Sequence, residues 1–246
     1  HSAHARWCET STGVWGVWQH DTQQADLAVL SIAAYQEVLA INRAANYPHL
    51  LRMWQTLDGI NQGEGDAERY KQFCVGRYEA LHAQGEVAQY AAATAVGGVL
   101  PMLQIIWWAG RSAGVAIESP RQIRAYQYSR AYGPRSPSFS RAMWVDNALW
   151  VSGTASIIDE TSLHAHCVMA QLDEIQCNFD ALNSQIQSQV RHVLQAIELR
   201  VYVRHAEDVA KVQPALQHRY PRAQCHYFLA DICRQELLIE IEGVWQ

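Results

Sequence analysis

The sequence predicts an α+β fold, similar to an α/β sandwich, in which a mixed β-sheet is covered by helices. In the second half of the chain, apolar residues switch between a period of two, typical of strands, and steps of three and four, typical of helices. These switches follow the order strand, strand, helix, strand, helix, strand, strand. The first half repeats that order less regularly, so we expect two related sheet-and-helix units.

A hairpin opens the second half. Trp144 with Val145 and residues 149–151 supply two apolar strands, and Asp146 with Asn147 between them suit a tight turn. The next element is a helix, whose apolar stripe consists of Leu172, Ile175, Phe179, Leu182 and Ile186. A helix with one such stripe is expected to cover one face of the sheet.

The rest of the second half alternates strands with a second helix. We expect a strand at residues 199–203, a helix from 209 to 216, and strands at residues 226–232 and 236–243. Pro214 falls inside this helix, where it removes one backbone donor and is expected to kink its end. The order of elements implies one mixed sheet covered by two helices.

The last strand carries two carboxylates among apolar residues. Because strand side chains alternate faces, Glu240 and Glu242 share one face and the odd-numbered residues the other. A carboxylate among apolar neighbours is either paired or protonated, and a proton held near neutral pH is what a general acid requires. Cys233 and Arg234 add a thiol and a guanidinium to the same segment. The alternative, favoured by composition alone, is that both glutamates lie on a solvated sheet face.

The first half contains a degraded copy of this plan. Residues 34–42 line up with residues 170–178, since both begin with Ala, end with Asn and lie in a helix that follows a strand region. Residues 91–98 lead into the apolar run at 100–108, where the second half has its two last strands. Two similar units packed together would place a cleft between them.

The connector, residues 119–141, joins an N-terminal unit of residues 1–118 to a C-terminal unit of residues 142–246. It is rich in Arg, Tyr and Pro. Arginine and tyrosine side chains at a junction between units are suited to hold an anionic ring. An ordinary linker with solvated arginines would have the same composition, and the residues alone leave both interpretations open.

Composition excludes several classes of protein. With 49% hydrophobic and only 17% charged residues, the chain is expected to be globular rather than disordered. The formal charge of −5 and the lack of a Lys/Arg cluster argue against a nucleic-acid or membrane-surface partner. The sequence has no nucleotide-binding signature and no ligand set at zinc spacing, so we expect neither a cofactor nor a metal ion.

The six cysteines are scattered without a C-x-x-C pair, which predicts reduced thiols and a cytoplasmic protein. Neither a signal peptide nor a membrane-spanning segment is recognisable. The sequence begins at His1 rather than Met, which leaves open whether a targeting segment has been removed.

Eight segments together resemble the chorismatase family, a branch of the superfamily of small RidA (YjgF) proteins. They occur in the expected order over nearly the whole chain, at residues 69–77, 94–98, 119–126, 132–134, 138–142, 152–157, 201–204 and 230–244. The resemblance implies a RidA-like, chorismate-mutase-like fold for the C-terminal unit and a degenerate related fold for the N-terminal unit.

The resemblance also implies an activity, cleavage of the enol ether of chorismate with release of pyruvate. The first glutamate of the terminal Glu-x-Glu pair is then the catalytic acid or base, which falls on Glu240, with Glu242 as a supporting charge. Ile239, Ile241 and Glu242 would keep Glu240 protonated, so that it can protonate the enolpyruvyl methylene carbon where water is scarce.

The two carboxylates of chorismate require arginines at two separated points. The candidates are Arg77, Arg124 and Arg204, with Tyr126 against the ring. Small residues at 152–157, including Thr154 and Ala155, would let the backbone approach the substrate closely.

The product depends on the branch of the family. A cysteine at the position of Cys233 resembles the branch that forms 3-hydroxybenzoate, with 4-hydroxybenzoate as an additional product. Ala155, in a loop where branches alternate Ala and Gly, leaves open the hydrolytic branch, which releases pyruvate and a dihydroxycyclohexadiene carboxylate. Residues 159–167 depart from the family pattern, which also bears on product choice.

Two other functions remain as alternatives. An imine or enamine hydrolase of the wider superfamily would need an arginine where Cys225 and His226 stand, which disfavours it. A non-catalytic metabolite-binding protein would keep the fold and the cleft without turnover. The wider superfamily forms trimers with sites between subunits, but an internal repeat can supply that interface within one chain, so we favour a monomer over a trimer.

Overall fold

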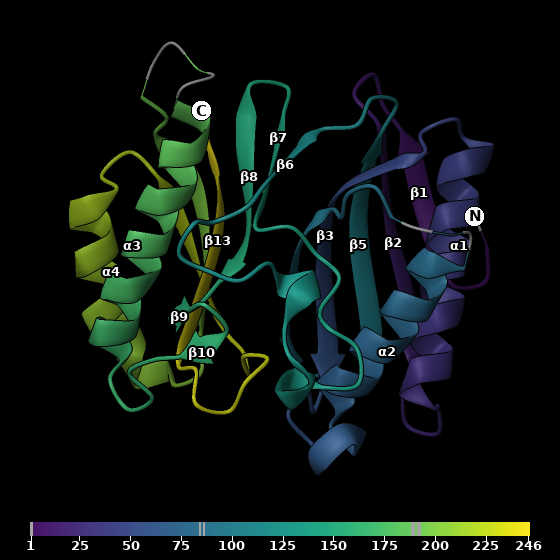
Figure 1. Cartoon of the computed structure of the whole chain (residues 1–246), viewed down its shortest axis with the longest axis horizontal. Helices are drawn as coiled ribbons and strands as arrows, with labels where there is room; N and C mark the ends of the chain where they lie inside the picture. Colours follow the sequence, from purple (N-terminus) through teal and green to yellow (C-terminus); the bar gives the residue numbers. More distant parts are fainter. Residues whose placement is uncertain (1, 84, 86, 188–189, 191–192) are drawn as a thin grey trace.

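The computed structural model describes residues 2–83, 85, 87–187, 190 and 193–246. In these ranges the chain forms two large β-sheets, and each packs its own pair of helices against one face (Figure 1). The predicted α+β class, with mixed sheets covered by helices, is confirmed.

The first sheet comprises five strands in the order β1-β2-β5-β3-β4. Its elements are β1 (Ala5–Glu9), β2 (Val14–Asp21), α1 (Leu27–Ala44), β3 (His49–Asp58), a short 3-10 helix (Gly65–Ala67), α2 (Arg69–His82), β4 (Ala92–Gly98) and β5 (Met102–Gly110). Apolar residues of α1 and α2 and of one sheet face form the core of this half.

The second sheet comprises six strands in the order β12-β11-β13-β8-β7-β6. Its elements are β6 (Val115–Ile117), β7 (Ala142–Val145), β8 (Ala148–Thr154), α3 (Val168–Gln187), β11 (Ala196–Val203), α4 (Val209–Arg219), β12 (Gln224–Leu229) and β13 (Ile239–Trp245). The remaining elements of this half lie outside that sheet. They are a separate two-stranded ribbon of β9 (Ile157–Ile158) and β10 (Thr161–Ser162), and 3-10 helices at Ala125–Gln127, Arg130–Tyr132 and Ala206–Asp208.

The two sheets share one topology. β1, β2, β5, β3 and β4 are neighbours in that order, and β7, β8, β13, β11 and β12 repeat it. In both series the last pair is parallel and the other neighbouring pairs are antiparallel. The segments aligned in the sequence, 34–42 and 170–178, lie in the equivalent helices α1 and α3. β6 lies before residue 118, within the expected N-terminal unit, but it pairs with β7 of the second sheet. The expected boundaries of the two units stay predictions.

Local signals placed most elements of the second half correctly. Asp146 and Asn147 adopt φ angles of 52° and 59°, as a tight hairpin turn requires, and join β7 to β8. The predicted apolar stripe of α3 is buried throughout. Pro214 lies inside α4, which continues to Arg219.

The two last strands are shorter than predicted. Residues 230–238 were expected to be largely strand, but they form a loop between β12 and β13. The side chain of Arg204, the residue after β11, explains the difference. Its guanidinium donates hydrogen bonds to the carbonyls of Ile232, Arg234 and Leu237. In a strand, these carbonyls would pair with a neighbouring strand.

A layer of tryptophans lies where the two halves meet. Trp15, Trp54 and Trp108 of the first sheet pack with Trp150 of the second, and the Trp15 and Trp108 rings stack at 5.2 Å between centroids. This layer fills the space between the sheets on the side where β4 and β8 approach each other. Among the helices of the described ranges, none is long and apolar enough to cross a membrane.

Candidate active site

The two glutamates of β13 lie at the contact between the halves. β13 runs between β11 and β8 in the second sheet, so both of its edges are paired. Ile239 and Ile241 point into the helix-covered core, whereas Glu240 and Glu242 point the other way, towards the first sheet. The predicted alternation is confirmed. A solvated sheet face is wrong, because Glu240 is only 4% and Glu242 only 1% exposed.

Glu242 is fully engaged by four donors. Its Oε2 accepts hydrogen bonds from Arg52 of β3 and Thr94 of β4. Its Oε1 accepts a hydrogen bond of 2.9 Å from the Tyr202 hydroxyl and a longer contact of 3.5 Å from Arg200. A carboxylate with every acceptor position used is held in one orientation.

Glu240 is buried without comparable partners. No residue in the described ranges donates a hydrogen bond to its carboxyl group. Burial raises its pKa to about 8, and the neighbouring Glu242 carboxylate contributes to the rise, whereas Arg52 and Arg141 oppose it. Ile239 and Ile241 were expected to keep Glu240 protonated, but they lie on the opposite face. The protonated form is instead favoured by the enclosed space between the sheets and by Glu242.

The backbone of β8 approaches Glu240 closely. Gly153 donates its N–H to Thr94 Oγ1 at 2.9 Å, and a Cβ at this position would overlap the Glu240 carboxylate. Glycine is required here because any side chain would displace the acid. Thr154 and Ala155, the next two residues, are both buried, which agrees with the small residues expected in this loop.

Cys233 lies beside Glu240 in the loop between β12 and β13. Burial raises the pKa of its thiol, the Glu240 carboxylate raises it further, and Arg234 opposes the change. The sulfur is therefore a neutral thiol rather than a thiolate. Arg204, expected to bind a substrate carboxylate, instead anchors this loop through its carbonyls and an ion pair with Asp231.

Arg77 of α2 is a buried cation with no carboxylate partner among the described residues. It is 1% exposed, contacts Gln55 Oε1 at 3.3 Å and Cys74 Sγ at 3.6 Å, and its Nε has no hydrogen-bond partner there. A buried guanidinium without a counter-charge is suited to an anionic ligand.

Tyr70 lies near both Arg77 and Glu240. It lies on the same helix and within electrostatic range of Cys74, Cys233, Arg77 and Glu240. Burial raises its pKa well above the ordinary value, and the nearby Cys74 and Cys233 raise it further. The sequence reasoning did not single out Tyr70, although it lies inside the family-like segment 69–77.

The connector contributes a buried arginine that the sequence reasoning missed. Arg141 is 4% exposed and donates to the Tyr128 hydroxyl and the Ile123 carbonyl, and it lowers the pKa of Glu240 through space. Arg124, the arginine expected here, is exposed. Tyr126 is partly buried, with its ring 4.8 Å from that of Tyr90.

Glu118, the residue just before the connector, is a second perturbed carboxyl group. Burial raises its pKa to about 7, while Arg141 and Arg124 oppose the change. Its two carboxyl oxygens are buried and find no hydrogen-bond partner in the described part of the chain. Nothing in the local sequence distinguishes Glu118, because its burial comes from the packing of the connector over the halves.

A groove leads from the surface to Cys233. It has a volume of about 400 Å³ and is lined by the start of α2, the connector and the loop that carries Cys233, with Tyr70, Tyr128 and Tyr132 among its walls. Arg234 lies 3.9 Å from the centre of the Tyr132 ring. The volume lies in the range of small-molecule sites.

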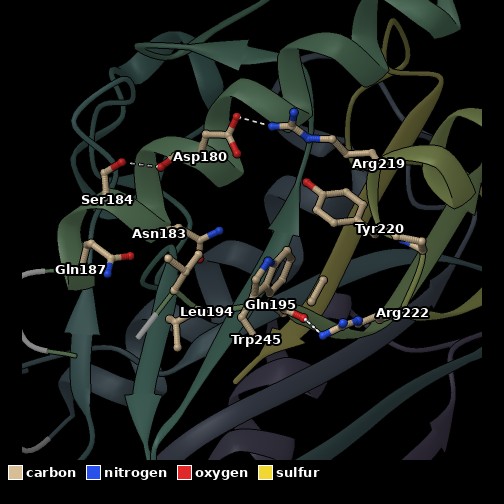
Figure 2. A pocket seen from close by; sticks show the side chains of 13 residues that line it. Asp180, Asn183, Ser184, Gln187, Leu194, Gln195, Arg219, Tyr220, Arg222 and Trp245 are labelled. Carbon is tan, nitrogen blue, oxygen red and sulfur yellow. Dashed lines mark hydrogen bonds and ion pairs between the residues drawn. The ribbon is translucent and has the colours of Figure 1, made fainter. Parts of the chain in front are cut away.

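A larger cavity lies elsewhere. It has a volume of about 610 Å³ and lies between the end of α3, the end of α4 and Trp245 (Figure 2). Trp245 is on the helix-covered side of β13, and five residues of strand place it roughly 17 Å from Glu240. This cavity is therefore separate from the glutamates. In the part of the chain that the structure describes, no three His, Cys, Asp or Glu residues gather as a metal site would need.

Fold and site together define an α+β protein with a buried carboxyl group whose pKa is raised, a buried arginine without a carboxylate partner among the described residues and a groove of metabolite size. Comparison with known proteins agrees. A family model of the N-terminal part of FkbO/Hyg5-like chorismatases matches residues 1–109. A 3-hydroxybenzoate synthase of Streptomyces hygroscopicus is 35% identical over 230 residues, which is 86% of this chain and 68% of that protein.

Two further relatives extend the match to the whole chain. A chorismatase of Streptomyces rapamycinicus is 34% identical over 255 residues, covering 97% of this chain and 76% of that protein. A crystal structure of a chorismatase superposes with a TM-score of 0.91 at 32% identity and covers 100% of this chain and 78% of its own. The chain belongs to the chorismatase family, as its sequence segments predicted.

Proposed function

We propose that the chain cleaves the enolpyruvyl ether of chorismate to pyruvate and 3-hydroxybenzoate, with Glu240 as the general acid. The observation that carries this proposal is the state of Glu240, which is buried, free of hydrogen-bond donors in the described ranges and has a pKa of about 8. The names of the relatives, 3-hydroxybenzoate synthase and chorismatase, support the substrate.

The chemistry needs an acid of this kind. Protonation of the enolpyruvyl methylene carbon creates an oxocarbenium ion, whose formation is helped when the acid becomes an anion beside it. A carboxyl group whose pKa lies near the working pH is largely protonated and is still acidic enough to transfer its proton. Exclusion of bulk water between the sheets protects the cation from early hydrolysis.

The substrate carboxylates require two cationic points. Arg77 meets this need best, because it is buried and lacks a counter-charge among the described residues. Arg141 is the second candidate, since it is buried and acts on Glu240, while Arg124 and Tyr126 would contact the ring from the connector side. Arg204 is assigned to the loop rather than to the substrate, because its donors already hold three carbonyls and Asp231.

Cys233 is proposed to direct the product. A neutral thiol next to the acid can donate its proton to the oxygen of a strained ring intermediate as the ring C–O bond breaks, and it regains a proton when a ring carbon loses one on aromatisation, which favours the aromatic product over attack by water. The aromatising reaction consumes no water, whereas the hydrolytic reaction consumes one molecule and yields the diol. The buried methyl group of Ala155 keeps the hydrolytic product as the second candidate.

Incubation with chorismate, with pyruvate measured enzymatically and ring products separated by chromatography, tests the proposal. We expect pyruvate and 3-hydroxybenzoate in equal amounts. Glu240→Gln should abolish pyruvate release, while Glu242→Gln, assayed at pH 6, should keep turnover. Tight chorismate binding without pyruvate would instead identify a metabolite-binding protein.

Substitution of the thiol tests product control. Cys233→Ala and Cys233→Val should raise the proportion of the non-aromatic diol, because the proton donor is lost and water competes better. Cys177→Ala, at an exposed thiol of α3, is the matched control and should leave the ratio unchanged. An unaltered ratio in the Cys233 variants would reject this role.

A further inference from the structure

Arg52 is the charged residue of the first sheet that donates hydrogen bonds to Glu242. It lies on β3, where the ladder with β5 has an irregularity between Leu50 and Arg52, and its side chain is 2% exposed. The guanidinium donates to the Met53 carbonyl at 2.6 Å and to the Val151 carbonyl at 3.3 Å, as well as to Glu242. It therefore binds both halves of the chain at once.

The hydrogen-bond pattern determines which species Glu242 is. The Thr94 oxygen accepts from Arg52 at 2.7 Å and from the Gly153 N–H at 2.9 Å, so its single hydroxyl proton is directed to Glu242. Since Arg52 and Thr94 are both donors, Glu242 Oε2 is an acceptor. Tyr202 donates to the other oxygen. This pattern, with donors on both oxygens, suits a Glu242 carboxylate.

Glu240 has the opposite surroundings. Two residues along the same strand face, it receives no donor from the described residues, so an anion there would be poorly solvated. Two neighbouring carboxyl groups that share one negative charge place it where the donors are. The proton is left to the member without donors.

We propose that Arg52 is a positioning residue that holds Glu242 as a fixed anion, so that the acid proton is carried by Glu240 alone. Arg52 donates no hydrogen bond to Glu240; it acts through Glu242, to which it is bonded, and through space on the pKa of Glu240. The inference rests on the proposed function, in which Glu240 is the acid, and it assigns to the first half of the chain a part in the chemistry of the second.

Several other polar and titratable groups face the pair. Those around Glu242 and Glu240, from every element packed against them, are Arg52, Thr94, Arg200, Tyr202, Arg141, Tyr70 and Cys233. Arg200 is 36% exposed and its contact is longer, so solvent screens it more than Arg52. Arg52 is the one buried cation bonded to Glu242 in the described ranges.

Arg52→Met removes the cation without changing the size of the side chain greatly. The proton is then shared between Glu240 and Glu242, and Glu240 becomes a weaker acid. The alkaline limb of the pH profile of kcat/KM should move upward by about one pH unit or more, and the plateau should fall about tenfold or more. Arg52→Lys, which keeps the charge, should restore the limb to within about half a unit of its original position.

A double variant separates this role from simple support of the fold. In Arg52→Met/Glu242→Gln the anion and its counter-charge are both absent, so the alkaline limb should return to near the wild-type pH. A residue that only stabilises the fold would lower the activity of every variant with no movement of the limb, and that result would overturn the proposal. If Arg52→Met does not fold, Tyr202→Phe, which leaves no charge unpaired, should move the limb upward by a smaller amount, and an unmoved limb would overturn the proposal as well.

Titration of the carboxyl groups keeps the inference independent of the substrate. Carbon-13 NMR of glutamate-labelled protein, with Glu240→Gln to assign the signal, should show Glu240 titrating at higher pH in Arg52→Met than in the wild type. If wild-type protein releases no pyruvate from chorismate, the proposed function fails while this comparison still decides the role of Arg52. If pyruvate is released and the Glu240 signal is unaffected by Arg52→Met, only the inference fails.

Discussion

Replacement of Glu240 by glutamine should make the protein more stable at alkaline pH. The ordinary pKa of a glutamate is 4.5, and burial with the Glu242 anion raises that of Glu240 to about 8 in the folded chain. Between these two pH values the folded state binds one proton more than the unfolded state, so the free energy of unfolding falls as pH rises. The whole difference corresponds to a loss of up to about 5 kcal/mol, complete above the folded pKa.

The amide introduced by Glu240→Gln cannot titrate, so the variant escapes this loss. Near pH 4.5 the variant and the wild type should be about equally stable, and by pH 9 the variant should be more stable by a few kcal/mol, on the order of half to all of the calculated difference. Urea unfolding followed by tryptophan fluorescence at several pH values measures this, with midpoints and slopes compared separately.

Glu64→Gln, at an exposed carboxylate, is the matched control and should follow the wild type at every pH. A Glu240→Gln curve that runs parallel to the wild type from pH 5 to 9 would refute the reasoning, because it would mean that Glu240 is ionised in the folded protein. Glu240→Gln is thus expected to gain stability and lose activity, because active sites commonly hold a catalytic group in surroundings that destabilise the folded state.

Two other predictions concern the walls of the site. Gly153→Ala places a Cβ where the Glu240 carboxylate lies, so kcat should fall about tenfold or more. Gly98→Ala, whose Cβ would meet Thr56 at an ordinary 3.5 Å, is the control and should leave kcat unchanged. Steady-state kinetics measure both variants, and equal kcat values would contradict the geometry. Arg77→Met should raise KM for chorismate about tenfold or more, since a charge-assisted contact to a carboxylate is lost, and Arg77→Lys should recover part of the loss; an unchanged KM with intact circular dichroism would exclude Arg77 from binding.

Local patterns in the sequence predicted the elements that depend on neighbouring residues. The Asp146-Asn147 turn, the apolar stripe of α3 and the alternation along β13 each follow from a side-chain period or a backbone preference within a few residues. The same locality explains the error at residues 230–238. Their apolar pattern is that of a strand, and only the distant Arg204 shows which carbonyls are already used.

For the candidate site, the sequence brought together only the residues that lie in one segment. Glu240, Glu242 and Cys233 lie in one segment, so their proximity is a property of the chain itself. Arg124 and Arg141 are similar in local composition, and only packing of the connector determines that Arg141 is buried while Arg124 is exposed. The segment 69–77 was recognised as a whole, without indicating that Tyr70 faces the site.

The sequence by itself determined that two carboxylates share one face of the last strand and that one of them must be paired or protonated. The residues alone did not distinguish them, and only the resemblance to the family assigned the acid to Glu240. The tertiary structure decided the matter, because Arg52, 190 residues before Glu242, crosses from the other sheet and donates to that carboxylate and not to Glu240. In the proposal made above, this charge, placed by the packing of the two halves over a distance that no local pattern spans, holds Glu242 as an anion and leaves the proton on Glu240.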